Sequence, residues 1–159
     1  MKTENAEYWI EKLGLEKHME GGFFRETYRS PEQLKRGSLP ERFPGHRDLM
    51  TSIYFLLKSN ELSALHRLRS DEIWHFYTGS SLTLKMISPG GTWSEITLGK
   101  NFEQGQVLQA VVKAGTWFAA EVDRPESFSL AGCTVSPGFD FDDFELDRKS
   151  TRLNSSHYS

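Results

Sequence analysis

The segment from His66 to Gly79, HRLRSDEIWHFYTG, holds two histidines, two acids and three aromatic residues within fourteen positions. Imidazole and carboxylate groups bind a transition metal when three or four of them converge on one point. The same groups can exchange protons with a substrate near neutral pH, or hydrogen-bond a small ligand without any chemistry. We therefore take His66, Glu72 and His75 as the first candidates for a functional site.

Strand geometry separates His75 from the other two candidates. Glu72 and His75 are three residues apart in the sequence, and such residues point to opposite faces of an uninterrupted strand. Only a bulge would bring both side chains to the same face. We therefore do not count His75 as a partner of Glu72, and keep it only as a candidate ligand-binding residue.

Further polar and aromatic residues could line a binding pocket. Arg25 can bind an anionic ligand or pair with Glu20 or Glu26, and both interpretations stay open. Aromatic rings are typical of a core or of a pocket wall. The candidate ligand-binding residues are Arg25, Glu26, Tyr54, Trp74, His75, Phe76, Gln109 and Trp117.

The pattern of apolar residues predicts one helix followed by many strands. The helix is expected around Trp9 and Leu13, with Thr3 or Asn5 as its cap and Gly14 at its end. Strands then recur at intervals of about ten residues, which predicts a closed or double-sheet β-barrel rather than βαβ units. The predicted strands cover residues 20–30, 51–57, 82–87, 93–98, 107–112, 116–122 and 127–135, besides the segment described first.

Two segments depart from this pattern. Residues 31–48 combine prolines, glycines and charges, and are expected to form a long loop or lid. Residues 149–159 lose both the alternation and the apolar content, so we expect a disordered tail or a remnant of an expression vector. His157 lies in this tail and is left out of the site. Residues 1–148 are then predicted to form a single domain.

Composition limits the classes of partner. The 159 residues, 37% of them hydrophobic, suffice for one domain with a core. The net charge of -3 offers no basic face for nucleic acid, and no apolar run is long enough for a membrane span or a signal peptide. We therefore expect a cytoplasmic protein that binds neither. The single cysteine, Cys133, is expected to be a small buried residue.

The spacing from His66 to Gly79 resembles the first motif of the cupin superfamily, in which two histidines one residue apart precede a glutamate and then a glycine. His66, Glu72 and Gly79 match this motif, whereas Leu68 stands at the second histidine. The stretch VVKAGTWF resembles the second motif, with Phe118 at the remaining histidine ligand. Because leucine and phenylalanine cannot coordinate, we expect no metal and no other cofactor.

This resemblance implies a fold and an assembly. The fold is an all-β cupin barrel, a double-stranded β-helix or jelly roll, with a short N-terminal helix. The span from Tyr8 to Arg148 resembles a small group of cupins labelled predicted sugar epimerases, which carry stretches like EGGYFRETY, SDEVWHFYxG and GCTVxPGFDFxDFEL. The family resemblance also implies a homodimer.

The stretch GFFRETY is similar, more distantly, to the GFFxExF stretch of the deoxythymidine-diphosphate-sugar epimerases. In those enzymes the glutamate helps to bind the nucleotide, and an arginine just before the glycine helps to bind phosphate. Glu26 matches the glutamate, and Gly21 stands at the arginine position. The LHR stretch around His66 resembles the place where those epimerases carry a catalytic histidine base, paired with an acid late in the chain.

This second resemblance implies proton transfer at a carbon next to a carbonyl group. Such a reaction needs a base near neutral pKa and an acid that returns a proton from the other face. His66 is the candidate base, and the GFDFDDF stretch would orient it through Asp140, Asp142 or Asp143. The candidate acids are Tyr28, Tyr54 and Tyr77. The predicted catalytic residues are His66, Glu72, Tyr28 and Asp142.

The leading prediction is a small-molecule-binding cupin that epimerises a sugar or a nucleotide sugar. A non-catalytic, ligand-binding or lectin-like cupin stays open, because aromatic rings and a few polar groups suffice to hold a small ligand. A metal-dependent oxygenase or isomerase also stays open, since one fold hosts many chemistries.

Overall fold

The computed structural model describes residues 4–147. It begins with helix α1, Ala6–Leu13, which Asn5 caps by accepting a hydrogen bond from the backbone N–H of Tyr8. Gly14 ends the helix with a positive φ of 64°, a conformation that glycine adopts without strain. The helix predicted from the sequence is confirmed. The tail expected at residues 149–159, with His157, lies outside the described residues.

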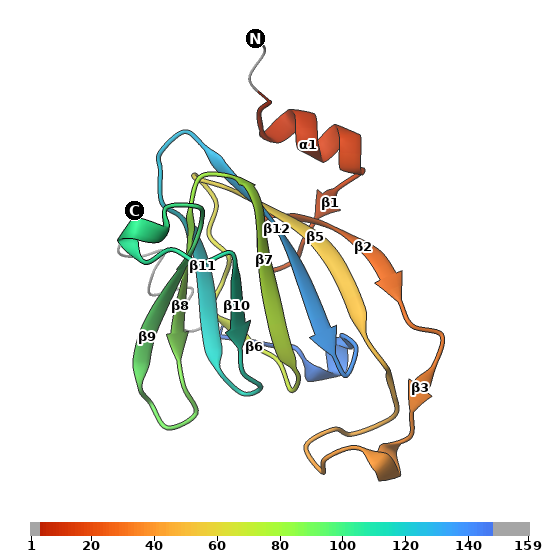
Figure 1. The fold of residues 1–159 in the computed structure, drawn as a ribbon. Coiled ribbons are helices and arrows are strands. Elements are labelled where there is room, and N and C mark those ends of the chain that lie inside the picture. The colour runs from red at the N-terminus through yellow and green to blue at the C-terminus, as the bar shows by residue number, and fades with distance from the viewer. Residues whose placement is uncertain (1–3, 148–159) are drawn as a thin grey trace.

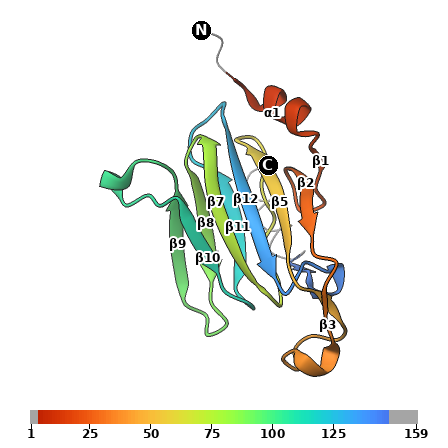
Figure 2. The same ribbon diagram turned by 45° about the vertical axis from the view of Figure 1, so that its right-hand side comes forward.

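Two sheets make up the body of the protein (Figures 1 and 2). The larger has the strand order β1-β2-β5-β12-β7-β10 and the smaller has the order β13-β6-β11-β8-β9. The strands of the larger sheet are β1 Glu16–Lys17, β2 Phe23–Arg29, β5 Thr51–Lys58, β7 Asp71–Gly79, β10 Gln109–Val112 and β12 Phe128–Ser136. The strands of the smaller sheet are β6 His66–Arg67, β8 Leu82–Ile87, β9 Trp93–Leu98, β11 Trp117–Val122 and β13 Glu145–Leu146. The predicted all-β jelly roll with one short helix is confirmed.

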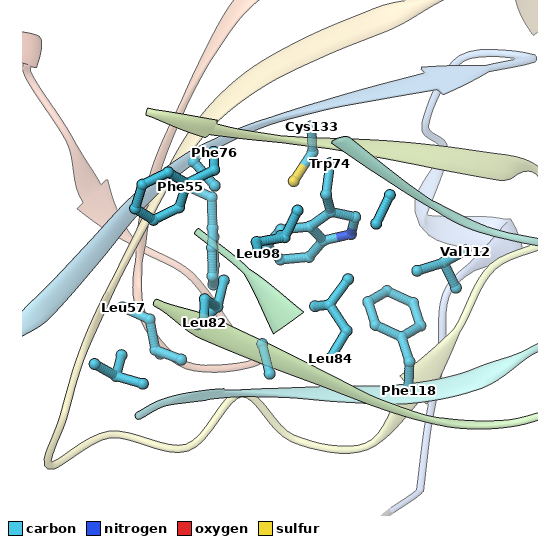
Figure 3. Packing of buried hydrophobic residues seen from close by; sticks show 14 of the residues in the cluster. Phe55, Leu57, Trp74, Phe76, Leu82, Leu84, Leu98, Val112, Phe118 and Cys133 are labelled. Carbon is cyan, nitrogen blue, oxygen red and sulfur yellow. The ribbon is translucent and has the colours of Figure 1, made fainter. Parts of the chain in front are cut away.

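The core lies between the inner faces of the two sheets. Figure 3 shows Trp74 at its centre, with Phe55 and Cys133 on one side and Leu84 and Phe118 on the other. Cys133 is buried, as predicted. A second apolar cluster lies on the outer face of the larger sheet, where α1 packs over Leu56, Phe128 and Leu130. No helix within residues 4–147 is long and apolar enough to cross a membrane.

Strand β7 keeps the alternation expected from its sequence. Glu72, Trp74 and Phe76 are buried on the inner face, while Asp71 and Tyr77 are exposed. His75 is on the outer face, where its Nε2 lies 3.4 Å from Oγ1 of Thr134. The prediction that His75 points away from Glu72 is confirmed.

Residues 31–48 form a loop with structure of its own, projecting from one end of the larger sheet (Figure 1). It contains the short pair β3, Gln33–Leu34, and β4, Arg47–Asp48, with the 3-10 turn η1, Arg36–Ser38, between them. Its closing end is fixed to η3, Phe141–Asp143, because buried Arg47 donates two hydrogen bonds, of 2.7 and 2.8 Å, to the carboxylate of buried Asp143. A third 3-10 turn, η2, Phe102–Gln104, follows β9.

Candidate functional site

A cavity of about 470 Å³ opens between the sheets at the end where η3 lies. Its walls come from the inner faces of β2, β5, β7 and β12, and from the segment after β12. Three aromatic rings of that last segment, Phe139, Phe141 and Phe144, form one side. The titratable groups in the cavity wall are Glu16, His18, Glu20, Arg25, Glu26, Arg29, His66, Glu72 and Cys133.

His66 is buried in this wall, and both of its ring nitrogens are engaged. Nδ1 lies 2.7 Å from the carbonyl oxygen of Ala64, and Nε2 lies 2.8 Å from Oε2 of Glu20. Burial alone would lower the pKa of His66, but the charge of Glu20 and its hydrogen bond outweigh burial and raise it. The raised pKa and the oxygen acceptors next to both ring nitrogens favour the imidazolium form, which donates to Ala64 and to Glu20 and leaves no lone pair free.

Glu20 is on the turn between β1 and β2, and only 8% of it is exposed. The next residue, Gly21, has a φ of 106°, and a side chain there would collide with the carbonyl oxygen of Leu62. The backbone N–H of Ala64 donates to the carbonyl of Glu20, which ties the turn to the segment leading into β6. The turn therefore holds the Glu20 carboxylate against His66, and the arginine of the nucleotide-sugar epimerases has no room at the position of Gly21.

His18 is on the same turn and is neutral. Its Nδ1 accepts a hydrogen bond of 3.1 Å from the backbone N–H of Glu20, so its proton is on Nε2. Burial lowers the pKa of His18, and the nearby charge of His66 acts in the same direction against the attraction of Glu20. The ring packs edge-on against Phe24, with its centroid 4.7 Å away. His18 thus offers a neutral N–H donor in the cavity wall.

Glu72 is the second buried carboxyl group of the cavity. Oε1 of Glu72 accepts a 2.8 Å hydrogen bond from the indole N–H of Trp74 on the same strand face. Burial raises the pKa of Glu72 to about 7, and the charge of Glu20 adds to this effect, while His66 and the Trp74 bond oppose it. The two carboxyl groups therefore differ sharply in surroundings. Glu20 contacts the His66 ring, whereas Glu72 has no cation in hydrogen-bond contact within residues 4–147, and with a pKa of about 7 a large share of it is protonated at neutral pH.

The mouth of the cavity holds charged side chains that form ion pairs and hydrogen bonds within the protein. Arg29 binds both carboxylate oxygens of Glu26, at 2.8 and 3.0 Å, and also Oδ2 of Asp48 at 2.7 Å. Arg25 donates from Nη1 to the carbonyl oxygen of Leu13 near the end of α1. The predicted ligand-binding residues Arg25 and Glu26 therefore both lie at the cavity.

Several other predicted residues lie on the outer face of the larger sheet. Tyr54 and His75 are both paired with Gly132 of β12, and Gln109 is paired with His75, so the three lie in one row across the strands. Tyr28 joins this face because a bulge between Glu26 and Tyr28 reverses the alternation. The structure thus places these residues on the opposite side of the sheet from His66.

The remaining predicted residues do not line the cavity. Asp142 is exposed on η3, where its backbone carbonyl accepts from Arg69. Trp74 and Phe76 are core residues, and Trp117 is half-buried under the guanidinium of Arg67, 4.5 Å from the ring centroid. The partner of His66 is therefore Glu20, and not an aspartate of the GFDFDDF stretch as predicted.

The residues at the cupin ligand positions do not fit a metal ion. Leu68 lines the cavity, and Phe118 packs on His66 with ring centroids 4.1 Å apart. Both nitrogens of His66 are engaged, and Trp74 occupies one oxygen of Glu72. Within residues 4–147 no group of three or more histidine, cysteine, aspartate or glutamate side chains could hold a metal ion.

Comparison with known families agrees with this architecture. A sequence profile of the cupin superfamily (DUF985) matches residues 7–147. The chain belongs to the cupin superfamily. This cupin is 29% identical to an uncharacterized protein of Saccharomyces cerevisiae, over 81% of this chain and 68% of the yeast protein.

Solved structures show the same fold. Protein SO0799 of Shewanella oneidensis has a TM-score of 0.83 and 43% identity, covering 96% of this chain and 90% of that one. A hypothetical protein of Leishmania major has a TM-score of 0.84 and 34% identity, covering 95% and 92%. Oxalate decarboxylase of Bacillus subtilis is similar in fold alone, with a TM-score of 0.56 and 14% identity over 82% of this chain and 29% of the enzyme.

Among the cavity residues that sequence reasoning missed, His18 and Glu20 matter most, because they contact the candidate residue His66 or its partner. They stand one residue apart just before the Gly21–Gly22 pair, in the stretch HMEGG. This stretch could have indicated a site, because it places an imidazole and a carboxylate beside two glycines with positive φ, and such a turn can hold side chains rigidly. Neither residue belongs to the cupin motif spacing, so that spacing did not point to them.

Proposed function

We propose that this cavity binds a small carbonyl compound of the sugar type and moves a proton at the carbon next to the carbonyl, as an epimerase or isomerase. The observation that carries the proposal is the contrast between Glu20 and Glu72. A pair of titratable groups with divergent surroundings is how proteins assign a base and an acid at one pH. The Glu20 carboxylate, paired with the His66 imidazolium, is the base, and protonated Glu72 is the acid.

In this proposal Glu20, and not His66 as predicted from the sequence, has the role of the base. Oε2 of Glu20 accepts from His66, while Oε1 has only a 3.9 Å contact with Nδ1 of His18. Oε1 can therefore accept a proton from carbon. His66 acts as a positioning residue, because its charge and its bond to Ala64 fix the carboxylate.

The proposed step balances without a co-reactant. Oε1 of Glu20 takes the proton from the carbon next to the carbonyl, and the C–H electron pair forms the enolate. The developing negative charge on the substrate oxygen is stabilised by donors that exist before the reaction, the Nε2–H of His18 and the carboxyl O–H of Glu72. Glu72 gives its proton to the opposite face of the carbon to form the epimer, and exchange with water then returns Glu20 to the carboxylate and Glu72 to the acid. For the isomer, protonated Glu20 gives its proton to the neighbouring carbon.

Binding without chemistry is the second candidate function, and the aromatic side of the cavity favours it. Phe139, Phe141 and Phe144 offer apolar faces of the kind that hold sugar rings in binding proteins. This alternative requires Glu20 and Glu72 only as hydrogen-bonding groups. It therefore predicts binding with no exchange of carbon-bound protons.

Hydrogen exchange in D₂O separates the two functions. A panel of ketoses and aldoses is incubated with the protein, and deuterium at the carbon next to the carbonyl is followed by proton NMR. We expect incorporation with the wild-type protein and a loss of at least about a hundredfold with Glu20→Gln, in line with the usual contribution of a catalytic base. Saturation-transfer NMR on the same variant checks that the sugar still binds.

Glu145→Gln is the matched control, because Glu145 accepts a 2.7 Å hydrogen bond from Arg67, as Glu20 accepts one from His66, but lies outside the cavity. Its exchange rate should equal that of the wild type. If the wild type binds a sugar but incorporates no deuterium, the epimerase function is rejected and the binding function is supported.

We also propose that the protein is a homodimer. Ile73, Tyr77 and Val111 are exposed apolar side chains on the outer face of the larger sheet, outside the area that α1 covers. Exposed apolar patches of this kind are typical of protein interfaces. Sedimentation equilibrium at micromolar concentration tests the assembly, and a mass of one chain would reject it.

A further inference from the structure

We infer that the cavity selects uncharged ligands, and that the Glu26–Arg29–Asp48 cluster at its mouth is the element that excludes phosphorylated ones. The inference rests on the proposed function and narrows its substrate class to free polyhydroxy carbonyl compounds, in place of sugar phosphates and nucleotide sugars. It follows from how the cations of the cavity are already bound.

Arg29 is the cation best placed at the mouth, and each of its three nitrogens already donates to a carboxylate. Nε and Nη2 form a two-point contact with the Glu26 carboxylate, at 2.8 and 3.0 Å. Nη1 donates to Asp48 at 2.7 Å. A phosphate is recognised by this same two-point arrangement of guanidinium N–H groups, so Glu26 occupies the position that a phosphate would need. Two carboxylates on one guanidinium also leave this cluster with a net negative charge.

The rest of the cavity does not compensate for this charge. Arg25 directs Nη1 to the carbonyl oxygen of Leu13, and the imidazolium of His66 is neutralised by Glu20. Glu16 adds a further carboxyl group to the wall. Among residues 4–147, no cation of the cavity wall is both unpaired and directed into the cavity, because the guanidinium of Arg25 is turned towards the end of α1. A phosphate entering this space would therefore approach carboxylates, and bringing like charges together is unfavourable.

The uncharged surfaces of the cavity define what it does accept. His18 Nε2–H and the Glu72 carboxyl O–H are neutral donors that suit a carbonyl or hydroxyl oxygen. Phe24 and the three rings after β12 suit the apolar C–H face of a sugar. A ligand with a carbonyl group, hydroxyls and no charge satisfies both kinds of surface.

The test compares ligands that differ in charge. Binding of D-fructose, fructose 6-phosphate and thymidine diphosphate glucose is measured by saturation-transfer NMR titration on the wild type, on Glu26→Gln and on the control Glu145→Gln. Glu26 is 37% exposed at its side chain, so the substitution is compatible with folding. It removes the negative charge while it keeps the size of the side chain, and it leaves Arg29 available to an anion.

We expect the wild type and Glu145→Gln to bind fructose at least about tenfold more tightly than fructose 6-phosphate, which is about 1.4 kcal/mol. Glu26→Gln should reduce this ratio to about one or reverse it. Equal or tighter binding of either phosphorylated ligand by the wild type overturns the inference, as does an unchanged ratio in Glu26→Gln. Failure of the wild type to bind any of the three ligands is a different result, because it rejects the proposed function itself and the inference with it.

Discussion

Replacing Glu72 with glutamine should stabilise the protein at neutral and alkaline pH. Burial raises the pKa of Glu72 from its ordinary value of 4.5 to about 7. The folded state therefore holds this proton more tightly than the unfolded state does. The stability that depends on it is complete below pH 4.5 and is lost as the pH rises through 7. Glutamine resembles the protonated acid and can still accept the hydrogen bond from Trp74.

The magnitude follows from the two pKa values. Each pH unit between them corresponds to about 1.4 kcal/mol, so ionised Glu72 lowers the free energy of unfolding by about 3 kcal/mol at pH 8. At pH 5 the loss should be only about 1 kcal/mol, because Glu72 is protonated in the folded state and is partly ionised only in the unfolded state. Glu72→Gln should therefore exceed the wild type by about 3 kcal/mol at pH 8 and by much less at pH 5.

Urea unfolding at pH 5, 6, 7 and 8 measures this difference, with the midpoints and slopes fitted separately at each pH. Glu145→Gln serves as the control, since Glu145 is exposed on β13 and its substitution should leave the pH dependence unchanged. Parallel stability curves for Glu72→Gln and the wild type from pH 5 to 8 would refute the reasoning. That result would mean that Glu72 is ionised in the folded protein at no cost.

Three further predictions concern the groups around the cavity and the long loop. His66→Gln leaves the buried carboxylate of Glu20 without its cation and should lower the free energy of unfolding by about 3–5 kcal/mol at pH 7. The double variant that also carries Glu20→Gln should recover much of this loss, which a double-mutant cycle measured by urea unfolding would show. Asp143→Asn breaks the buried ion pair with Arg47, so it should lower the free energy of unfolding by about 3 kcal/mol and speed limited proteolysis of the loop at residues 31–48. An unchanged cleavage rate would contradict the idea that this ion pair fixes the loop. Gly21→Ala should cost more than Gly105→Ala in urea unfolding, because both have positive φ but only Gly21 is against a backbone carbonyl; equal losses would contradict the steric argument.

Local periodicity predicted the strands and the helix well. The helix ends at Gly14 as expected, and the strands predicted at 51–57, 82–87, 93–98 and 116–122 correspond closely to β5, β8, β9 and β11. These segments have strong alternation and clear turn residues, which act within a few positions of one another. The short strands β1, β3, β4 and β13 were not predicted, because two-residue pairings depend on a distant partner and not on a pattern of their own.

The bulge in β2 shows where counting along the strand failed. The alternation of GFFRETY placed Tyr28 on the same face as Glu26, and so on the face of the site. In the structure the pairing with β5 shifts between Glu26 and Tyr28, which moves Tyr28 to the outer face. An extra residue in one strand inverts every side chain after it, and nothing in the alternation itself reveals the insertion.

The sequence by itself placed His66 and Glu72 in one site through their resemblance to the cupin motif. It also separated His75 from Glu72, because spacing along a strand fixes the face on which each side chain lies. It also determined that two cupin ligand positions hold Leu68 and Phe118. Only the tertiary structure decided what His66 does, by bringing Glu20 from a distant turn to within 2.8 Å of it. The physical reason is that the charge on a buried histidine depends on its partner, and that partner is set by packing between sheets rather than by neighbours in the chain.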